Sequence, residues 1–147
     1  MAFFRASCVI DGPVEHVWDV LCDWEATRHW MVPPTTVEVM GEQRTGVGAR
    51  LHAVTTIGRV FRLTDQMVVT DWIEHREIRT RHVGWMLRGD GIFRLHADGE
   101  RTRFEWIEDL PLPLGVVGEL VGLLLRPLVE RLMRRGCARL GAFVGAR

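Results

Sequence analysis

Apolar and polar residues alternate along most of the chain up to Glu108, which predicts a series of short strands with one buried face each. The clearest case is Ala2 to Ile10, where apolar residues at every second position are separated by Arg5 and Ser7. Further strands are expected at about Thr36 to Met40, Ala49 to Ile57, Val60 to Thr70, Glu77 to His82, Val83 to His96 and Thr102 to Glu108. Short strands joined by short turns favour an antiparallel sheet.

Helical spacing replaces this alternation in three places. Val14, Val17, Trp18 and Leu21 follow Pro13 at the spacing of an amphipathic helix, and Asp23 to His29 could add another turn or two. The third segment is much longer and runs from about Leu114 to about Val144. A helix of this length must bury its apolar stripes against the sheet, so we expect it to lie across the sheet.

Pro127 falls in the middle of the long helical segment. Proline removes one backbone hydrogen bond and clashes with the preceding turn, so a kink is expected near Leu123 to Arg126. Gly118 and Gly122 lie shortly before this kink, and the helix is narrower there because glycine has no side chain. They either permit close packing on the sheet or make this part of the helix pliant enough to gate the interior.

Length and composition indicate one domain spanning residues 1–147, since 147 residues with 47% hydrophobic content suit a single core. The formal net charge is zero, which gives no excess of positive charge for nucleic-acid binding. From Leu110 onward, however, six arginines face two glutamates, a net +4 that leaves the preceding part at −4. This basic segment is either a solvated helix face or a surface for weak peripheral contact with an anionic membrane or an acidic partner.

Cys8, Cys22 and Cys137 have no close spacing and lie among apolar neighbours, so we interpret them as reduced thiols and expect a cytoplasmic protein. The N-terminal apolar run is too short for a signal peptide, and charges interrupt the C-terminal one, so no transmembrane segment is expected. The histidines show no metal-ligand spacing, and no phosphate-binding loop or nucleophile turn is present. We therefore expect neither a metal nor a cofactor.

Several short motifs occur in a characteristic order. The run from Ile10 to Trp18 reads Ile-Asp-Gly-Pro-Val-Glu-His-Val-Trp, and it is followed by Asp23-Trp24, Trp30 and a Gly46-Val47-Gly48 turn. Thr102 to Trp106 then precedes the long terminal helix. This order resembles the superfamily of START-type lipid-binding domains, polyketide cyclases/dehydrases and birch-pollen-allergen-like proteins, and the resemblance covers essentially the whole chain.

The resemblance implies an α+β helix-grip fold. In that fold a curved, seven-stranded antiparallel sheet wraps around a long C-terminal helix, with two short helices after the first strand. Members of the superfamily bind lipids, sterols, polyketides or hormones in a cavity between sheet and helix, and a minority catalyse cyclisation, aromatisation or dehydration there. Fold alone leaves the chemistry open.

Alternation assigns apolar side chains to the inner face of the expected sheet, where they form either a ligand pocket or a filled core. Curvature around one helix, and glycines on that face, favour a cavity. The residues expected to contact a ligand are Trp30, Leu51, Ala53, Thr55, Phe61, Leu63, Met67, Trp85, Leu87, Gly91, Phe93, Phe104, Trp106, Val121, Leu124 and Leu128.

Few polar residues share this face. Asp65 and Glu108 fall inward, where burial would raise the pKa of a carboxylate and prepare it for acid–base chemistry, unless it pairs with Arg50 or Arg62 or lies in water at a strand end. His52 and Arg50 alternate outward, but a one-residue bulge would reverse them. His75 and His82 flank a turn and a strand end, where a lone histidine is usually solvated.

Three functions remain open from the sequence. The first is a carrier or sensor that holds a lipid, a polyketide or a quinone-like molecule. The second is a polyketide cyclase or dehydrase in which Glu108, Asp65 or His52 transfers a proton to or from the substrate and Arg50 stabilises a developing enolate. The third is an interaction protein that uses its basic terminal helix. With Ser7 as the sole serine and no tyrosine, the carrier is favoured.

Overall fold

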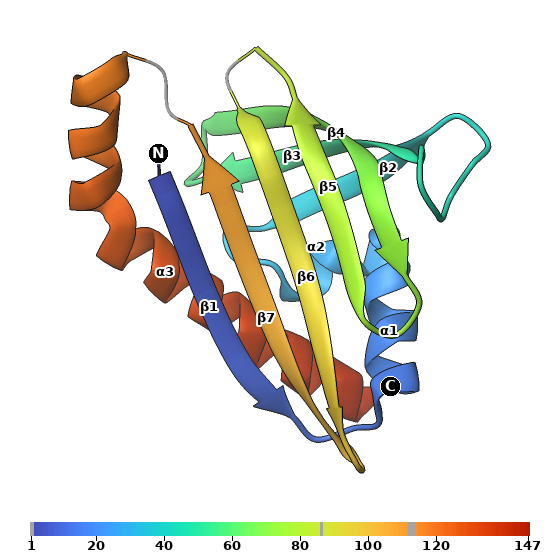
Figure 1. Ribbon diagram of the computed structural model, residues 1–147. Helices are drawn as coiled ribbons and strands as arrows, with labels where there is room; N and C mark the ends of the chain where they lie inside the picture. Colours follow the sequence, from blue (N-terminus) through green and yellow to red (C-terminus); the bar gives the residue numbers. More distant parts are fainter. Residues whose placement is uncertain (1, 86, 112–113) are drawn as a thin grey trace.

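The computed structural model describes residues 2–85, 87–111 and 114–147. Within these residues, seven strands form one antiparallel sheet in the order β1-β7-β6-β5-β4-β3-β2 (Figure 1). The strands are β1 (Ala2–Ile10), β2 (Thr35–Met40), β3 (Arg50–Ile57), β4 (Phe61–Ile73), β5 (Glu77–Val83), β6 (Arg88–Asp98) and β7 (Arg101–Leu110). The helices are α1 (Val14–Cys22), the 3-10 turn η1 (Trp24–Ala26), α2 (Thr27–Trp30) and α3 (Gly115–Ala146).

The expected α+β architecture is confirmed. Short helices follow β1, and the long helix α3 follows β7 at the end of the chain. The sheet is strongly curved, because β2, β3 and β4 run across the direction of β1, β7 and β6 (Figure 1). This curvature gives the sheet a concave inner face, on which the helices lie, and a convex outer face.

Strand alternation predicted the inner face correctly in most of the sheet. In β1, the side chains of Ala2, Phe4 and Ala6 are buried and those between them are exposed. In β7, Phe104 and Trp106 are buried on the same inner face. Apolar side chains therefore cover the inside of the sheet, as the period of two requires.

Two predicted boundaries were wrong. The strand expected from Val83 to His96 is interrupted: β5 continues to Val83, β6 begins at Arg88, and Trp85 and Leu87 lie in the connection between them. The turn expected from Asp71 begins later, because β4 continues to Ile73 after a register shift between Val69 and Asp71. Such a bulge inserts one residue without ending the strand.

The long helix is confirmed at Gly115–Ala146, with Pro127 inside it, and its axis changes direction near the middle (Figure 1). Only its C-terminal half lies across the sheet as expected. There, Met133, Cys137, Leu140 and Val144 are buried in the core.

None of the described helices is sufficiently long and apolar to cross a membrane.

The N-terminal half of α3 runs beside the edge strand β1 instead of across the inner face (Figure 1). Gly118 and Gly122 are its buried residues, so the helix approaches its neighbours through positions without side chains. Its large apolar residues are exposed as a result: Val116, Val117, Leu120, Val121, Leu123, Leu124, Leu125 and Leu128. The expectation that the whole helix covers the sheet is therefore corrected for this half.

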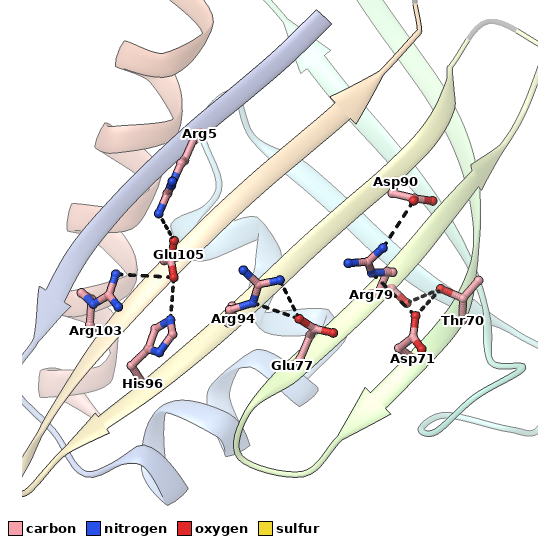
Figure 2. A network of polar contacts seen from close by, with 10 residues as sticks. All are labelled: Arg5, Thr70, Asp71, Glu77, Arg79, Asp90, Arg94, His96, Arg103 and Glu105. Carbon is pink, nitrogen blue, oxygen red and sulfur yellow. Dashed lines mark hydrogen bonds and ion pairs between the residues drawn. The ribbon is translucent and has the colours of Figure 1, made fainter. Parts of the chain in front are cut away.

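The outer face of the sheet carries a network of charged side chains (Figure 2). One group within it forms around Glu105, which is only 3% exposed although it points away from the core. Glu105 accepts hydrogen bonds from Arg5 and from Nε2 of His96, and it forms an ion pair with Arg103 at 3.4 Å. Burial alone would raise the pKa of Glu105, but the bonds from His96 and Arg5 outweigh it and hold that pKa below its usual value.

Candidate ligand-binding site

One end of the inner face is filled by aromatic side chains. The Trp30 ring lies 5.8 Å from that of Phe93, 6.3 Å from Phe104 and 5.9 Å from Trp106, measured between ring centroids. The tilted and edge-to-face arrangements of these rings are the stable ones for aromatic pairs. Leu140 from α3 is fully buried in the same core. This part of the inner face is packed core.

The other end of the inner face carries a polar cluster formed by Asp65 on β4, His82 on β5 and Glu108 on β7. Nδ1 of His82 lies 2.5 Å from Oδ2 of Asp65, and Nε2 of His82 lies 3.0 Å from Oε2 of Glu108. His82 is 7% exposed and Asp65 is 9% exposed. The imidazole thus bridges two carboxylates in a buried position.

Gly91 on β6 makes this bridge possible. β6 lies between β5 and β7, and Gly91 pairs with Thr80 on one side and with Glu108 on the other. A Cβ atom at Gly91 would lie 3.1 Å from Oε2 of Glu108 and 3.2 Å from Nε2 of His82. Because glycine has no side chain, His82 reaches over β6 to the carboxylate on the next strand.

The two carboxylates keep His82 protonated. Burial alone would lower the pKa of the imidazole, but the hydrogen bonds to Asp65 and Glu108 and the charges of both carboxylates raise it to about 10. Both ring nitrogens can donate to a carboxylate at once only in the imidazolium form. At neutral pH the cluster therefore keeps a proton on His82.

The cluster leaves one oxygen without a partner. Glu108 uses both oxygens, because Nε1 of Trp106 donates to its Oε1 at 2.9 Å. Oδ1 of Asp65, in contrast, is buried and has no hydrogen-bond partner among the described residues. Nε1 of Trp30 is also buried and unpartnered. Such atoms are rare in folded proteins. Trp30 lies in the packed core, whereas Oδ1 of Asp65 lies in the polar cluster, where a bound molecule could form a hydrogen bond with it.

Sequence reasoning predicted two members of this cluster and missed the third. Asp65 and Glu108 do point inward, but no described ion pair joins either of them to Arg50 or Arg62. His82 was expected in solvent and is buried, because β5 continues past it and the carboxylates neutralise its charge. The signal that could have found it is alternation in β5, which places His82 on the same face as the buried Ile78.

The other two catalytic candidates lie elsewhere. Arg50 and His52 sit on the face of β3 opposite to the buried Leu51 and Ala53, so the outward register is the observed one. His52 pairs with Glu38 on β2 and with Gln66 on β4. The structure does not bring Arg50 or His52 to the cluster.

The residues expected to contact a ligand divide into three groups by burial. Trp30, Leu51, Ala53, Gly91, Phe104 and Trp106 are buried. Thr55, Leu63, Met67, Leu87 and Phe93 are half-buried. Phe61, Trp85, Val121, Leu124 and Leu128 are exposed, with 59% of Phe61, 84% of Trp85 and 80% of Leu124 accessible to solvent. The buried group belongs to the filled core together with the half-buried Phe93, and the exposed group leaves apolar surface accessible to solvent.

The exposed apolar residues belong to one end of the sheet. β5 and β7 end there and β4 and β6 begin there, and the N-terminal half of α3 starts beside it (Figure 1). We call this end the open end and define it by Ile57 to Phe61, Val83 to Trp85, Leu87 to Arg88 and the N-terminal half of α3, residues 115–128. The polar cluster lies at the same end, since His82 is next to the last residue of β5 and Glu108 is near the last residue of β7.

A hollow of about 660 Å³ lies at the opposite end, between the start of α1 and the β4–β5 turn, where His75, Arg76, Arg94 and His96 line it. It is open and charged, unlike the apolar cavity expected between sheet and helix. A much smaller gap of about 50 Å³ separates β1 from the N-terminal half of α3. The expected enclosed cavity coincides with neither space and stays a prediction.

Residues 2–85, 87–111 and 114–147 contain no group of three or more histidine, cysteine, aspartate or glutamate side chains arranged to hold a metal ion. The Asp65–His82–Glu108 cluster is bound together by hydrogen bonds between its own members.

Solved structures share this fold along nearly the whole chain. A protein of Thermus thermophilus superposes with a TM-score of 0.80 at 20% identity, covering 98% of this chain and 97% of that one. The Zhui aromatase/cyclase from Streptomyces sp. R1128 gives 0.79 at 19% identity, with 99% and 94% covered. A START superfamily protein from Mycobacterium smegmatis gives 0.75 at 17% identity, with 96% and 98% covered. The fold is therefore the START-like helix-grip fold.

Residues 1–144 match the family model for polyketide cyclase/dehydrase and lipid transport proteins. The chain belongs to this family. No curated protein matches it.

Proposed function

We propose that the protein binds a small hydrophobic molecule, such as a lipid, a polyketide or a quinone-like compound, at the open end of the inner face. The observation that carries this proposal is the exposure of Phe61, Trp85 and Leu124 beside the buried polar cluster. Large apolar side chains gathered at the rim of a concave surface are typical of ligand sites. The cluster would anchor the polar group of the ligand.

Titration with a neutral apolar dye, Nile red, tests this proposal. We expect saturable fluorescence enhancement with micromolar affinity, and weaker binding in Trp85→Ser and Leu124→Ser. Val9→Ser is the matched control, because Val9 is 64% exposed on β1 but lies far along the strand from the open end. Absence of binding, or equal weakening in Val9→Ser, would reject the proposal. Native mass spectrometry of the purified protein would detect a co-purified ligand.

The Asp65–His82–Glu108 cluster favours a second candidate, an acid–base enzyme of the cyclase or dehydrase type. The imidazolium would pass a proton through Asp65 to a leaving hydroxyl, and a carboxylate of the cluster would accept one from carbon or oxygen. Dehydration of an aromatic β-hydroxyketone, followed by absorbance, tests this role. His82→Gln should abolish turnover while Nile red binding persists, whereas an unchanged rate in His82→Gln would exclude the role.

We also propose weak peripheral membrane contact through α3. Arg131, Arg134, Arg135 and Arg139 are exposed on its C-terminal half, and the apolar residues of the open end lie on its N-terminal half. Cosedimentation with phosphatidylserine vesicles should be lost in the combined Arg131→Glu, Arg134→Glu, Arg135→Glu variant, with Nile red binding intact.

The cytoplasmic location stays a prediction. The three cysteines are unpaired in the structure.

A further inference from the structure

The members of the Asp65–His82–Glu108 cluster have already used every hydrogen atom that they could donate. Both imidazole nitrogens point at carboxylate oxygens, at 2.5 and 3.0 Å. A carboxylate has no donor of its own when ionised. The cluster therefore offers a ligand acceptors and no donor, and among its carboxylate oxygens Oδ1 of Asp65 is the one buried without a partner among the described residues.

The cluster also carries a net charge of −1 wherever its shared proton lies. Two carboxylates with an imidazolium give this charge, and moving the proton from Nδ1 of His82 to Asp65 gives a neutral ring, a neutral acid and one carboxylate. The described ion pairs of Asp65 and Glu108 are those with His82, so no arginine offsets the charge. The indole N–H groups of Trp106 and Trp30 are neutral donors and do not offset it either.

We propose that this cluster sets the chemical class of the ligand: it selects apolar molecules whose polar group donates a hydrogen bond, a hydroxyl or an ammonium, and it excludes carboxylates. This inference rests on the proposed ligand-binding function. Oδ1 of Asp65 is the atom that receives the ligand's hydrogen bond. A hydroxyl or an ammonium would satisfy that buried oxygen. A carboxylate would bring a second negative charge next to a cluster whose own N–H donors are both used.

Fatty acids and other anionic amphiphiles are therefore poor ligands of this site, whereas phenols, enols, alcohols and long-chain amines are good ones. We expect the preference for such donor ligands to be about 10-fold to 100-fold in affinity, because this is the usual effect of one hydrogen bond to a charged group.

A series of ligands with one common ring tests the inference. Displacement of Nile red at neutral pH is measured for 2-naphthol, 2-naphthylmethylamine, 2-naphthoate and 2-methylnaphthalene. We expect the alcohol and the amine to bind at least about 10-fold more tightly than both the carboxylate and the methyl compound. If 2-naphthoate binds as tightly as 2-naphthol, the inference is wrong while the proposed function stands. If none of the four binds, both are wrong.

Two near-isosteric variants assign the effect to the cluster. Asp65→Asn removes one charge. Its carbonyl oxygen should face Nδ1 of His82, so an NH2 donor takes the place of Oδ1 toward the ligand, and the ratio of 2-naphthol affinity to 2-naphthoate affinity should fall toward one. Glu108→Gln removes one charge but leaves Oδ1 of Asp65 in place, so exclusion of the carboxylate should relax while 2-naphthol keeps its advantage over 2-methylnaphthalene. An unchanged ratio in folded Asp65→Asn protein contradicts the inference. If Asp65→Asn does not fold, the ligand series on the unmodified protein decides alone.

Discussion

Gly91 on β6 lies directly opposite Glu108 on β7, and a Cβ atom at Gly91 would come within 3.1 Å of Oε2 of that glutamate. The same atom would lie 3.1 Å from Oγ1 of Thr80. The gap left by this glycine is occupied by polar atoms from the strands on both sides. The polar cluster thus depends on a residue that takes no part in its chemistry.

We therefore expect Gly91→Ala to displace the hydrogen bond between His82 and Glu108. Overpacking at a tight buried position typically costs about 1 to 3 kcal/mol. The loss should be visible as a lower free energy of unfolding in urea, and as a lower pKa of His82 measured by NMR. Gly145→Ala is the control, because a Cβ there meets no atom within 4 Å. Equal stability of the two variants would contradict this account.

The sequence predicted the face on which Asp65 and Glu108 lie but could not predict what they contact. Alternation depends only on the chain, whereas the contact between His82 and Glu108 depends on the register of three strands. The sequence did not reveal this register, because alternation does not show that β5 ends at Val83 and that β6 begins at Arg88. A shift of one residue there would have moved His82 to the outer face.

The position of α3 shows a similar limit. Its N-terminal half is apolar on most sides, so periodicity does not reveal which stretch packs and which remains exposed. Gly118 and Gly122 decide this in the fold, since they allow close approach and leave the leucines facing away. Close packing through glycines was one of the two expectations for this region. The exposure of Leu124 and Leu128 was foreseen by neither.

Alkaline pH should destabilise the protein through His82. Its pKa is raised to about 10 in the folded state, against an unfolded value of about 6.5, so its contribution is fully present below about pH 6.5 and is lost as the pH rises toward 10. Urea unfolding between about pH 6 and about pH 10 should show a loss of more than about 1 kcal/mol, and His82→Gln should remove the part of this loss that His82 causes.

The chain contains neither lysine nor tyrosine, so those side chains add nothing to the alkaline loss of stability. The cysteines do contribute. Burial raises the pKa of Cys22 to about 12, and the hydrogen bond with Cys8 raises that of Cys137, so both thiols ionise more readily in the unfolded chain. A background in which Cys8, Cys22 and Cys137 are all replaced by alanine removes these contributions. An alkaline slope that persists in His82→Gln on that background would show that His82 is not its source.

Acidic pH should destabilise the protein through Glu105 on the outer face. Its pKa is held below the usual value, so its contribution is present above about pH 4.5 and is lost as the pH falls through the folded pKa. Glu105→Gln should lower the free energy of unfolding by about 1 to 3 kcal/mol at neutral pH and flatten the acid limb of its pH dependence. Glu100→Gln, at an exposed position in the β6–β7 turn, should leave both unchanged. If both variants lost the same free energy of unfolding as the pH falls, the network in Figure 2 would not have this role.

A leucine-to-alanine substitution should affect stability strongly in the C-terminal half of α3 and only weakly in its N-terminal half. Leu140 is fully buried, so Leu140→Ala should cost about 2 to 5 kcal/mol of stability. Leu124 is 80% exposed, so Leu124→Ala should change stability by less than about 0.5 kcal/mol. Nile red affinity should nevertheless fall in Leu124→Ala, because the exposed side chain contributes to the ligand surface and not to the core. A large loss of stability in Leu124→Ala with unchanged dye binding would mean that the N-terminal half of α3 packs against the sheet in solution and that the open end is closed.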